Sequence, residues 1–314
     1  MSDEDPVGAA RAWLEDHGGR AVVVPHGDPD GLAAGAILAK KAVGGVLHLE
    51  SPWEGDLPQD RPAVVADWGV RPTPGAAEVL FVDHHADPEP VDGVVLHAEG
   101  TGDPSTSMLA WRLLGFRPAL AWLAALGAVG DLGKGAHGRD GVPRVSSPTA
   151  LGRVAVLASA AGRLRQGPVP EAFGMLAESA GEVDALQRPE IAALEQGRRQ
   201  VERYRAAGMK VAPTVGSRAA LVALDLPARV HSQVAAAWTR RLAPRIVVVA
   251  NSGGRENRVS FSVRSAEAID LRAWLREVYS PPPGSGDYAR GHARATGGSL
   301  NPAVFDEFAA AVLR

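Results

Sequence analysis

The sequence has 314 residues, a formal net charge of -3 and a pI near 6.3, with 46% hydrophobic and 22% charged residues. A globular chain of this length is typical of two domains, each with a core of its own. A net negative charge argues against a protein that binds the phosphate backbone of long duplex DNA. Because the chain has no cysteine, disulfides, thiolate nucleophiles and zinc–thiolate sites are excluded.

The start of the chain carries no targeting signal that we recognise. Residues 1–20 are acidic and lack the apolar core of a signal peptide. No stretch offers about 18 uninterrupted apolar residues, the usual minimum for a membrane span. We therefore expect a cytoplasmic protein with no membrane partner. The sequence leaves the oligomeric state open, with a homodimer among the options.

In the first half, short β-branched runs alternate with helical stretches. Helices are predicted at Asp5–Asp16, Gly31–Ala42, Pro104–Leu114 and Pro118–Val129. Strands are predicted at Ala21–Pro25, Val46–Leu49, Ala63–Asp67, Val79–Asp83 and Val94–His97. Continuous apolar strands separated by helices are typical of a parallel sheet that is covered on both faces. We therefore predict a doubly wound, mostly parallel α/β domain over residues 1–200.

The second half begins with helices and returns to strands. From Pro148 the pattern is helical and ends in the charged stretch Glu190–Ala207, which we predict to be a helical connector. The later elements are strands at Ala219–Leu224, Arg245–Ala250 and Arg258–Arg264, and helices at Val230–Arg241, Ile269–Val278 and Asn301–Leu313. The Pro- and Gly-rich segment Ser280–Gly286 is predicted to be a loop. This pattern predicts a smaller mixed α/β domain over residues 208–314.

Acidic and histidine residues gather where predicted strands and helices of the first half end. The set consists of His26, Asp28, Asp30, Asp67, Asp83, His84, His85 and Asp131. Because the carboxyl ends of parallel strands meet at one edge of a sheet, we expect these side chains in one cleft. Carboxylates and imidazoles together suit manganese, with magnesium or zinc as alternatives. Two ions about 3.5–4 Å apart could share a carboxylate and activate a water for attack on phosphorus.

Each of these residues also has an ordinary structural interpretation. Asp67 taken alone would most often be a turn or helix-cap residue, and Asp28 and Asp30 could cap the next helix. His48 and His97 are single histidines in apolar surroundings, and we interpret them as structural. Capping does not explain why the four clusters, at His26–Gly31, Asp67, Asp83–His85 and Asp131, occur together in this order.

The Asp83-His84-His85 triplet and the clusters around it resemble the DHH phosphoesterase family, and the resemblance spans nearly the whole chain. It implies metal ligands at His26, Asp28, Asp30, Asp67, His84 and Asp131. It further implies that Asp67 bridges two manganese ions and that His85 supports the ligands or faces phosphate. Catalysis is thereby assigned to Asp67, His84, His85 and Asp83.

The C-terminal half resembles the domain that accompanies this family. Gly291–Gly297 is similar to its glycine-rich loop, and Val259–Ser265 is similar to the strand whose arginine holds substrate. The resemblance assigns substrate binding to Arg264, Gly291 and His292, with Arg290 as an extra cation where the family commonly has glycine. A glycine-rich turn can present backbone N–H groups to phosphate, and an arginine can bind it bidentately.

The spacing of the first cluster, H-x-D-x-D, is closer to RecJ exonucleases than to nano-RNases and pAp phosphatases, in whose alignment Leu32 would replace a ligand. With the acidic pI and only 5% aromatic residues, the resemblance implies manganese-dependent hydrolysis of phosphodiester bonds in short single-stranded nucleic acid. Two Mn²⁺ ions are expected, with Mg²⁺ as a substitute. The alternatives are small nucleotides such as pAp or cyclic dinucleotides, polyphosphate and, least favoured because every cluster is intact, a catalytically inactive binding subunit.

Overall fold

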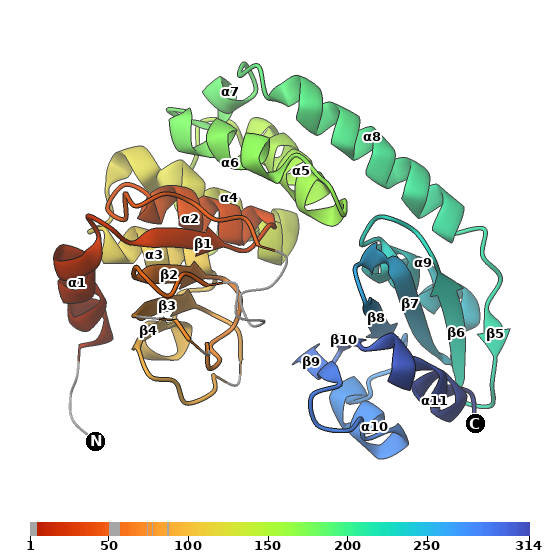
Figure 1. Ribbon diagram of the computed structural model, residues 1–314. Coiled ribbons are helices and arrows are strands. Elements are labelled where there is room, and N and C mark those ends of the chain that lie inside the picture. The colour runs from red at the N-terminus through yellow and green to blue at the C-terminus, as the bar shows by residue number, and fades with distance from the viewer. Residues whose placement is uncertain (1–4, 50–56, 74, 77, 87) are drawn as a thin grey trace. The chain divides into compact units, whose positions relative to one another are not determined.

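The computed structural model describes residues 5–49, 57–73, 75–76, 78–86 and 88–314, and the chain divides into two compact units. Unit 1 comprises Met1–Gly162 and Pro168–Arg198, and unit 2 comprises Arg163–Gly167 and Arg199–Arg314. Each unit has a sheet and a hydrophobic core of its own (Figure 1).

Unit 1 is built on a parallel sheet with the strand order β1-β2-β3-β4. The strands are β1 (Val22–Pro25), β2 (Ala63–Ala66), β3 (Val79–Asp83) and β4 (Val94–His97). Every residue of β1, β2 and β3 is buried, as their unbroken apolar sequences predict for a sheet covered on both faces. The predicted α/β class is confirmed.

The predicted strand Val46–Leu49 is reduced to a single parallel bridge between Val46 and Val23. Val23 donates its N–H to Gly45 and accepts from Leu47, whereas its neighbours in β1 pair with β2. Residues 45–47 therefore lie beyond β1, on the side away from β2. The chain winds outward in both directions from β1, and ligands of such sheets usually bind where the strand order reverses, here at the carboxyl ends of β1 and β2.

The helices of unit 1 share one core around α2, whose residues are all buried. The helices are α1 (Pro6–His17), α2 (Pro29–Leu38), α3 (Thr106–Leu113), α4 (Ala121–Leu132), α5 (Pro148–Arg163), α6 (Val169–Glu178), α7 (Glu182–Ala185) and α8 (Ile191–Gly208), which continues into unit 2. α2 packs against α3, α4 and α6, and its small residues allow this close packing. On the other face of the sheet, a second core includes Leu57, Val70 and Trp68 from connecting segments.

Unit 2 contains a mixed sheet with the strand order β5-β6-β7-β8-β10-β9. Its strands are β5 (Thr214–Val215), β6 (Ala219–Leu224), β7 (Ile246–Arg255), β8 (Arg258–Arg264), β9 (Gly286–His292) and β10 (Ala295–Leu300). Only β6 and β7 pair in parallel among these strands. α10 (Leu271–Val278) and α11 (Pro302–Leu313) cover the face that bears Val248 and Phe261. α9 (His231–Leu242) packs against β7 and β8 without joining that core.

The glycine-rich segment predicted as a loop forms a β-hairpin instead. Gly291 lies in β9 and Gly297 in β10, and β10 also pairs with β8. A Cβ added to Gly297 would overlap the backbone oxygen of Phe261, so the glycine permits close strand contact. Gly291 and His292 thus lie in one strand of the hairpin and Ala295–Gly297 in the other, with Ala293 and Arg294 between them. β7 is likewise longer than predicted and ends at Arg255.

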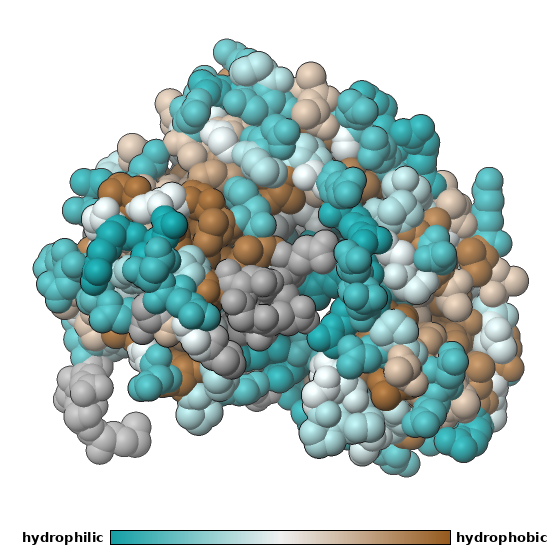
Figure 2. All heavy atoms as spheres, viewed as in Figure 1, coloured by the Kyte–Doolittle hydropathy of each residue, from teal (hydrophilic) through white to brown (hydrophobic). Residues whose placement is uncertain are grey.

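Hydrophilic side chains predominate on the face drawn in Figure 2, with apolar ones scattered among them. Such scattered apolar residues are ordinary at protein surfaces. Within the described ranges, the helices are too short or too polar to cross a membrane.

Candidate metal centre

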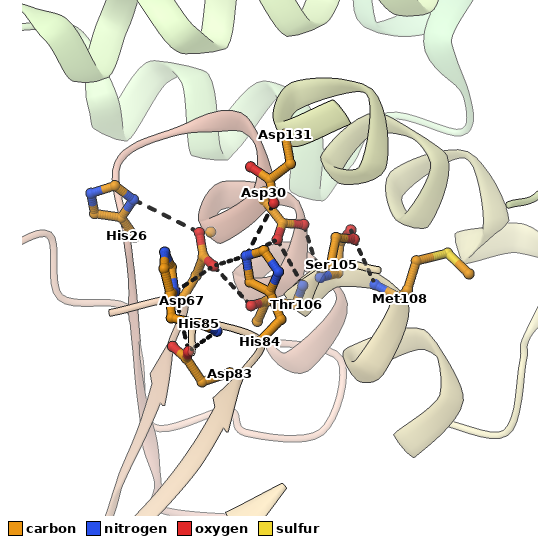
Figure 3. Close-up of polar contacts among 12 residues, drawn as sticks. His26, Asp30, Asp67, Asp83, His84, His85, Ser105, Thr106, Met108 and Asp131 are labelled. Carbon is orange, nitrogen blue, oxygen red and sulfur yellow. Dashed lines mark hydrogen bonds and ion pairs between the residues drawn. The ribbon is translucent and has the colours of Figure 1, made fainter. Parts of the chain in front are cut away.

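The polar clusters of unit 1 meet at the carboxyl edge of its sheet. His26 follows β1, Asp67 follows β2, and Asp83 ends β3 immediately before His84 and His85. Parallel pairing places these three strand ends side by side. The sequence prediction that one sheet edge collects these side chains therefore agrees with the geometry (Figure 3).

Two helices complete the cluster. Asp28 is the N-cap of α2, where its side chain accepts the N–H of Gly31 at 3.0 Å, and Asp30 lies in the first turn. Asp131 lies in the last turn of α4 rather than after it. The capping interpretation of Asp28 is thus correct, and capping leaves its second oxygen 3.0 Å from Nδ1 of His26.

Within the described part of the chain, three sets of side chains have ligand atoms no more than 4.8 Å apart. The sets are His26, Asp28 and Asp67; Asp67, His84 and His85; and Asp30, His84 and Asp131. Asp67 and His84 each belong to two sets. All six ligands that the sequence analysis assigned are thus in one cluster, together with His85.

Asp67 lies at the centre of this cluster. Its side chain is 2% exposed, and its oxygens lie 3.5 Å from Nε2 of His84 and 3.8 Å from Nδ1 of both His26 and His85. Its backbone has a φ of 68°, in the left-handed region where side chains other than Asn and Asp are disfavoured. A strained backbone that aims one buried carboxylate at three histidines is typical of a functional site.

The start of α3, which the sequence analysis did not assign to the site, holds two of these carboxylates. Backbone N–H groups of Thr106 and Ser107 donate to the two oxygens of Asp30, at 2.7 and 2.9 Å. The Thr106 hydroxyl donates to Oδ1 of Asp67 at 2.8 Å. The run Ser105-Thr106-Ser107 was recognisable as a helix start, but the distant carboxylates it would hold were not.

Replacing Thr106 with valine should lower the affinity for Mn²⁺ by roughly 10–100-fold, as is usual for hydrogen-bond partners of ligands. Valine keeps the shape but removes the donor to Asp67. Thr106→Ser, which keeps the hydroxyl, should bind almost normally. Calorimetric titration of both variants with MnCl₂ measures the effect, and wild-type affinity in the valine variant would contradict this role.

Asp83 lies outside all three sets and supports His85. Its Oδ1 accepts the backbone N–H of His85 at 2.7 Å and lies 3.1 Å from Nδ1 of the same residue, while Oδ2 accepts from Gly69 at 2.6 Å. Burial lowers the pKa of His85, but its contact with Asp83 outweighs this and raises the pKa above its usual value. Nε2 of His97 lies 2.7 Å from the backbone oxygen of His85, which agrees with a structural histidine at that position.

The electrostatics of the cluster fit a bound cation. Burial, with the charge of Asp131, raises the pKa of Asp30 to about 7. Burial and four neighbouring carboxylates raise the pKa of Asp67 well above its usual value. Nδ1 of His26 is buried without hydrogen-bond geometry to any described group. Divalent ions would neutralise these crowded carboxylates and take up the unused imidazole nitrogen.

No protein-family model matches the sequence, and no curated protein does. Among solved structures, the chain is similar to exonuclease RecJ bound to manganese, with 21% identity, a TM-score of 0.64, and coverage of 98% of this chain and 94% of that one. RecJ from Thermus thermophilus in complex with Mn²⁺ has 20% identity and a TM-score of 0.67. The alignment covers 99% of this chain but only 55% of that RecJ, which is the longer chain. The chain has the fold of the DHH proteins.

A further structure with the DHH fold is PggH of Vibrio cholerae, described as a pGpG-specific phosphodiesterase. It has 16% identity and a TM-score of 0.51, with coverage of 93% of this chain and 97% of that one. The family resemblance seen in the sequence is therefore confirmed at the level of the fold, in both units.

The residues expected to bind substrate all lie in unit 2 of the DHH fold. Arg264 ends β8 opposite Ala295 of β10, which in turn pairs with His292. Arg290 and Gly291 precede His292 in β9, and the side chain of His292 lies outside the described structure. Nη1 of Arg264 donates to the backbone oxygen of Val263 at 2.9 Å. Register thus groups these positions on three adjacent strands of unit 2.

Proposed function

We propose that the protein is a metal-dependent phosphoesterase that hydrolyses phosphodiester bonds of short single-stranded oligonucleotides. The observation that carries the proposal is the buried Asp67, whose carboxylate belongs to two sets of metal-ligand atoms at the edge of the sheet. The DHH fold, shared with a RecJ exonuclease and a pGpG phosphodiesterase, supports it. So does the absence of cysteine, since a metal-activated water needs no thiol nucleophile.

Two Mn²⁺ ions fit the donor set, with Mg²⁺ as a substitute. His26, Asp28 and Asp67 would hold one ion, and Asp30, His84 and Asp131 the other, with Asp67 between them. When bound, the ions would activate a water and neutralise the phosphoryl oxygens. RecJ structures with Mn²⁺ and with Mg²⁺ support this choice of ions.

The remaining residues of the site would position the reactants. Thr106 and the start of α3 hold Asp30 and Asp67 in fixed orientations. Asp83 holds His85 by one ring nitrogen, so this half-exposed imidazole can face the phosphate or protonate the leaving oxygen. In unit 2, Arg264, Arg290, Gly291 and His292 would bind the substrate. The catalytic domain would thus correspond to residues 1–200 and the substrate-binding domain to residues 208–314.

A second candidate is hydrolysis of a small nucleotide. The likeness to PggH supports it, because the substrate in that description is a dinucleotide. Phosphatase or phosphodiesterase activity on pAp, cyclic dinucleotides or polyphosphate would use the same cluster, so the substrate-binding unit must discriminate. A catalytically inactive subunit is least favoured, since all six ligand positions carry competent side chains.

The test is a substrate panel assayed on protein stripped with a chelator and then reconstituted. Activity should vanish on chelation and return best with Mn²⁺. Single-stranded oligomers from dimer to about thirty nucleotides should be cleaved most efficiently at the short end, with a weak dependence on salt because few phosphates are neutralised. Full activity after rigorous chelation would end the two-metal proposal. Processive degradation of long strands with a steep salt dependence would end the short-substrate proposal.

A further inference from the structure

Trp68 lies beside His26 in the turn that follows β2. Trp68 directly follows Asp67, whereas His26 directly follows β1. Pro25 and Ala66 pair across these two strands, and His26 donates its backbone N–H to the oxygen of Ala66 at 3.0 Å. The indole and the imidazole form an edge-to-face contact, with ring centroids 4.7 Å apart and ring planes at 76°. Aromatic rings prefer this arrangement to a face-to-face stack.

The backbone is fixed on both sides of Trp68. Asp67 has a φ of 68° and Gly69 has a φ of 83°, so both flanking residues lie in the left-handed region. Asp67 donates its backbone N–H to the oxygen of Val82 at 3.1 Å, and Gly69 donates to Oδ2 of Asp83 at 2.6 Å. Because the turn is anchored to β3 at both ends, few orientations remain open to the indole between them.

The half-buried Trp68 side chain also packs against the second core of unit 1, which includes Leu57 and Val70. Its indole N–H is buried and has no hydrogen-bond partner among the described residues. A buried donor without a partner costs stability. The indole therefore contributes through the surface of its ring and not through its N–H.

The imidazole of His26 needs such a support. A Cβ added to Gly31 would lie 2.6 Å from Cβ of His26, so the start of α2 confines the main chain of His26 but not its ring. Nδ1 of the ring lies 3.0 Å from Oδ2 of Asp28 and 3.8 Å from Oδ2 of Asp67 (Figure 3). A rotation of the ring would turn Nδ1 away from both carboxylates, and the edge-to-face contact with Trp68 opposes that rotation.

We propose that Trp68 is a positioning residue that keeps Nδ1 of His26 directed at Asp28 and Asp67, and that it thereby sets the affinity for one of two ions. The proposal rests on the proposed function for the presence of two ions. His26 shares a set of ligand atoms with Asp28 and Asp67 but not with His84. Trp68 should therefore act on the ion held by His26 and leave the other ion unaffected.

Calorimetric titration of the metal-free full chain with MnCl₂ tests this role. The wild type should bind two ions. Trp68→Leu keeps an apolar side chain but removes the ring, so it should bind one ion normally and the other roughly 10–100-fold more weakly, as for other groups that orient ligands. Trp68→Phe restores a ring and should recover most of the lost affinity. Electron paramagnetic resonance should show a coupled Mn²⁺ pair in the wild type and an isolated ion in Trp68→Leu at limiting metal.

The matched control is Trp111→Leu, which removes another half-buried indole of unit 1, in edge-to-face contact with Phe116 at 4.9 Å. It should lower the melting temperature and leave both Mn²⁺ affinities unchanged. The same behaviour in Trp68→Leu would show that Trp68 is only a core residue, and equal weakening of both ions would also overturn its role.

The proposed function and the role of Trp68 can fail separately. If Trp68→Leu weakens one ion selectively but the wild type hydrolyses no phosphodiester, the proposed function fails and the role of Trp68 stands. If the wild type hydrolyses phosphodiesters and Trp68→Leu binds both ions normally, the role of Trp68 fails alone. A wild type that binds no Mn²⁺ would overturn both.

Discussion

Asp67→Asn should abolish hydrolysis and Mn²⁺ binding while leaving the metal-free protein at least as stable as the wild type. Even changes to residues that only support ligands cost about 10–100-fold, so loss of a shared ligand should cost more than ~100-fold in activity. Asparagine has the shape of the protonated acid and tolerates the left-handed backbone at this position. Alanine would add backbone strain and confuse the comparison.

The stability of metal-free Asp67→Asn relative to the wild type should depend on pH. The pKa of Asp67 is raised above its usual 3.8 in the folded state. The protonated side chain therefore contributes fully to the free energy of unfolding below pH 3.8, and this contribution is lost as pH rises through the raised pKa. Metal-free wild type and variant should therefore melt together near pH 4, and the variant should melt higher at neutral pH. Each kcal/mol of relieved repulsion corresponds to about 2–4 °C in melting temperature.

Melting curves with and without MnCl₂ measure both effects, because an ion that binds only the folded state raises the melting temperature. Asp103→Asn is an informative control, since Asp103 is buried but pairs with Arg112 at 2.6 Å. That variant should be destabilised whether or not metal is present. A variant at position 67 that gains as much from Mn²⁺ as the wild type would show that Asp67 is only a turn residue.

Gly127→Ala should weaken the metal centre, because the added side chain would displace Asp30. Gly127 lies inside α4, where alanine normally stabilises a helix by about 0.5–1 kcal/mol. At this position the new Cβ would overlap Oδ1 of Asp30 and Oγ of Ser107. We expect a loss of about 1–3 kcal/mol in stability, as for other overpacked cores, together with weakened Mn²⁺ binding.

Gly152→Ala is the matched control, because Gly152 lies inside α5 and a Cβ there would meet no atom within 4 Å. It should leave metal binding unchanged and raise stability slightly. Chemical denaturation and Mn²⁺ titration of the two variants side by side provide the measurement. Equal, stabilising behaviour of both alanines would mean that Asp30 is not held against α4 as the structure indicates.

Much of the site followed from the sequence because its signals are local. A run of buried apolar residues that ends in Asp or His marks the carboxyl end of a strand, and parallel pairing brings such ends together. β3 and β4 begin and end as predicted, and the clusters at His26, Asp67 and Asp83 fall where the strands stop. The fold class followed from the same alternation of strands and helices.

The sequence predictions were wrong or incomplete where contacts with residues distant in the sequence determine the local structure. The segment Gly291–Gly297 has the composition of a loop, yet it forms a hairpin of β9 and β10 that is joined to the sheet by pairing with β8. Val46–Leu49 has strand composition but forms only one bridge. Thr106 and Asp67 share a side-chain hydrogen bond although they are 39 positions apart in the sequence. A local sequence pattern does not reveal such a contact.

The chain passes between its two units three times, because the short segment Arg163–Gly167 belongs to unit 2 and lies between two parts of unit 1. Arg229 donates its backbone N–H to Arg163 at 2.7 Å, and Leu164 bridges with Ala228. A fragment cut once near residue 200 would therefore keep this segment without its partners, and the complementary fragment would lose the backbone contacts of Arg163 and Leu164. Exchanging unit 2 between relatives by recombination would require two transplanted stretches rather than one crossover.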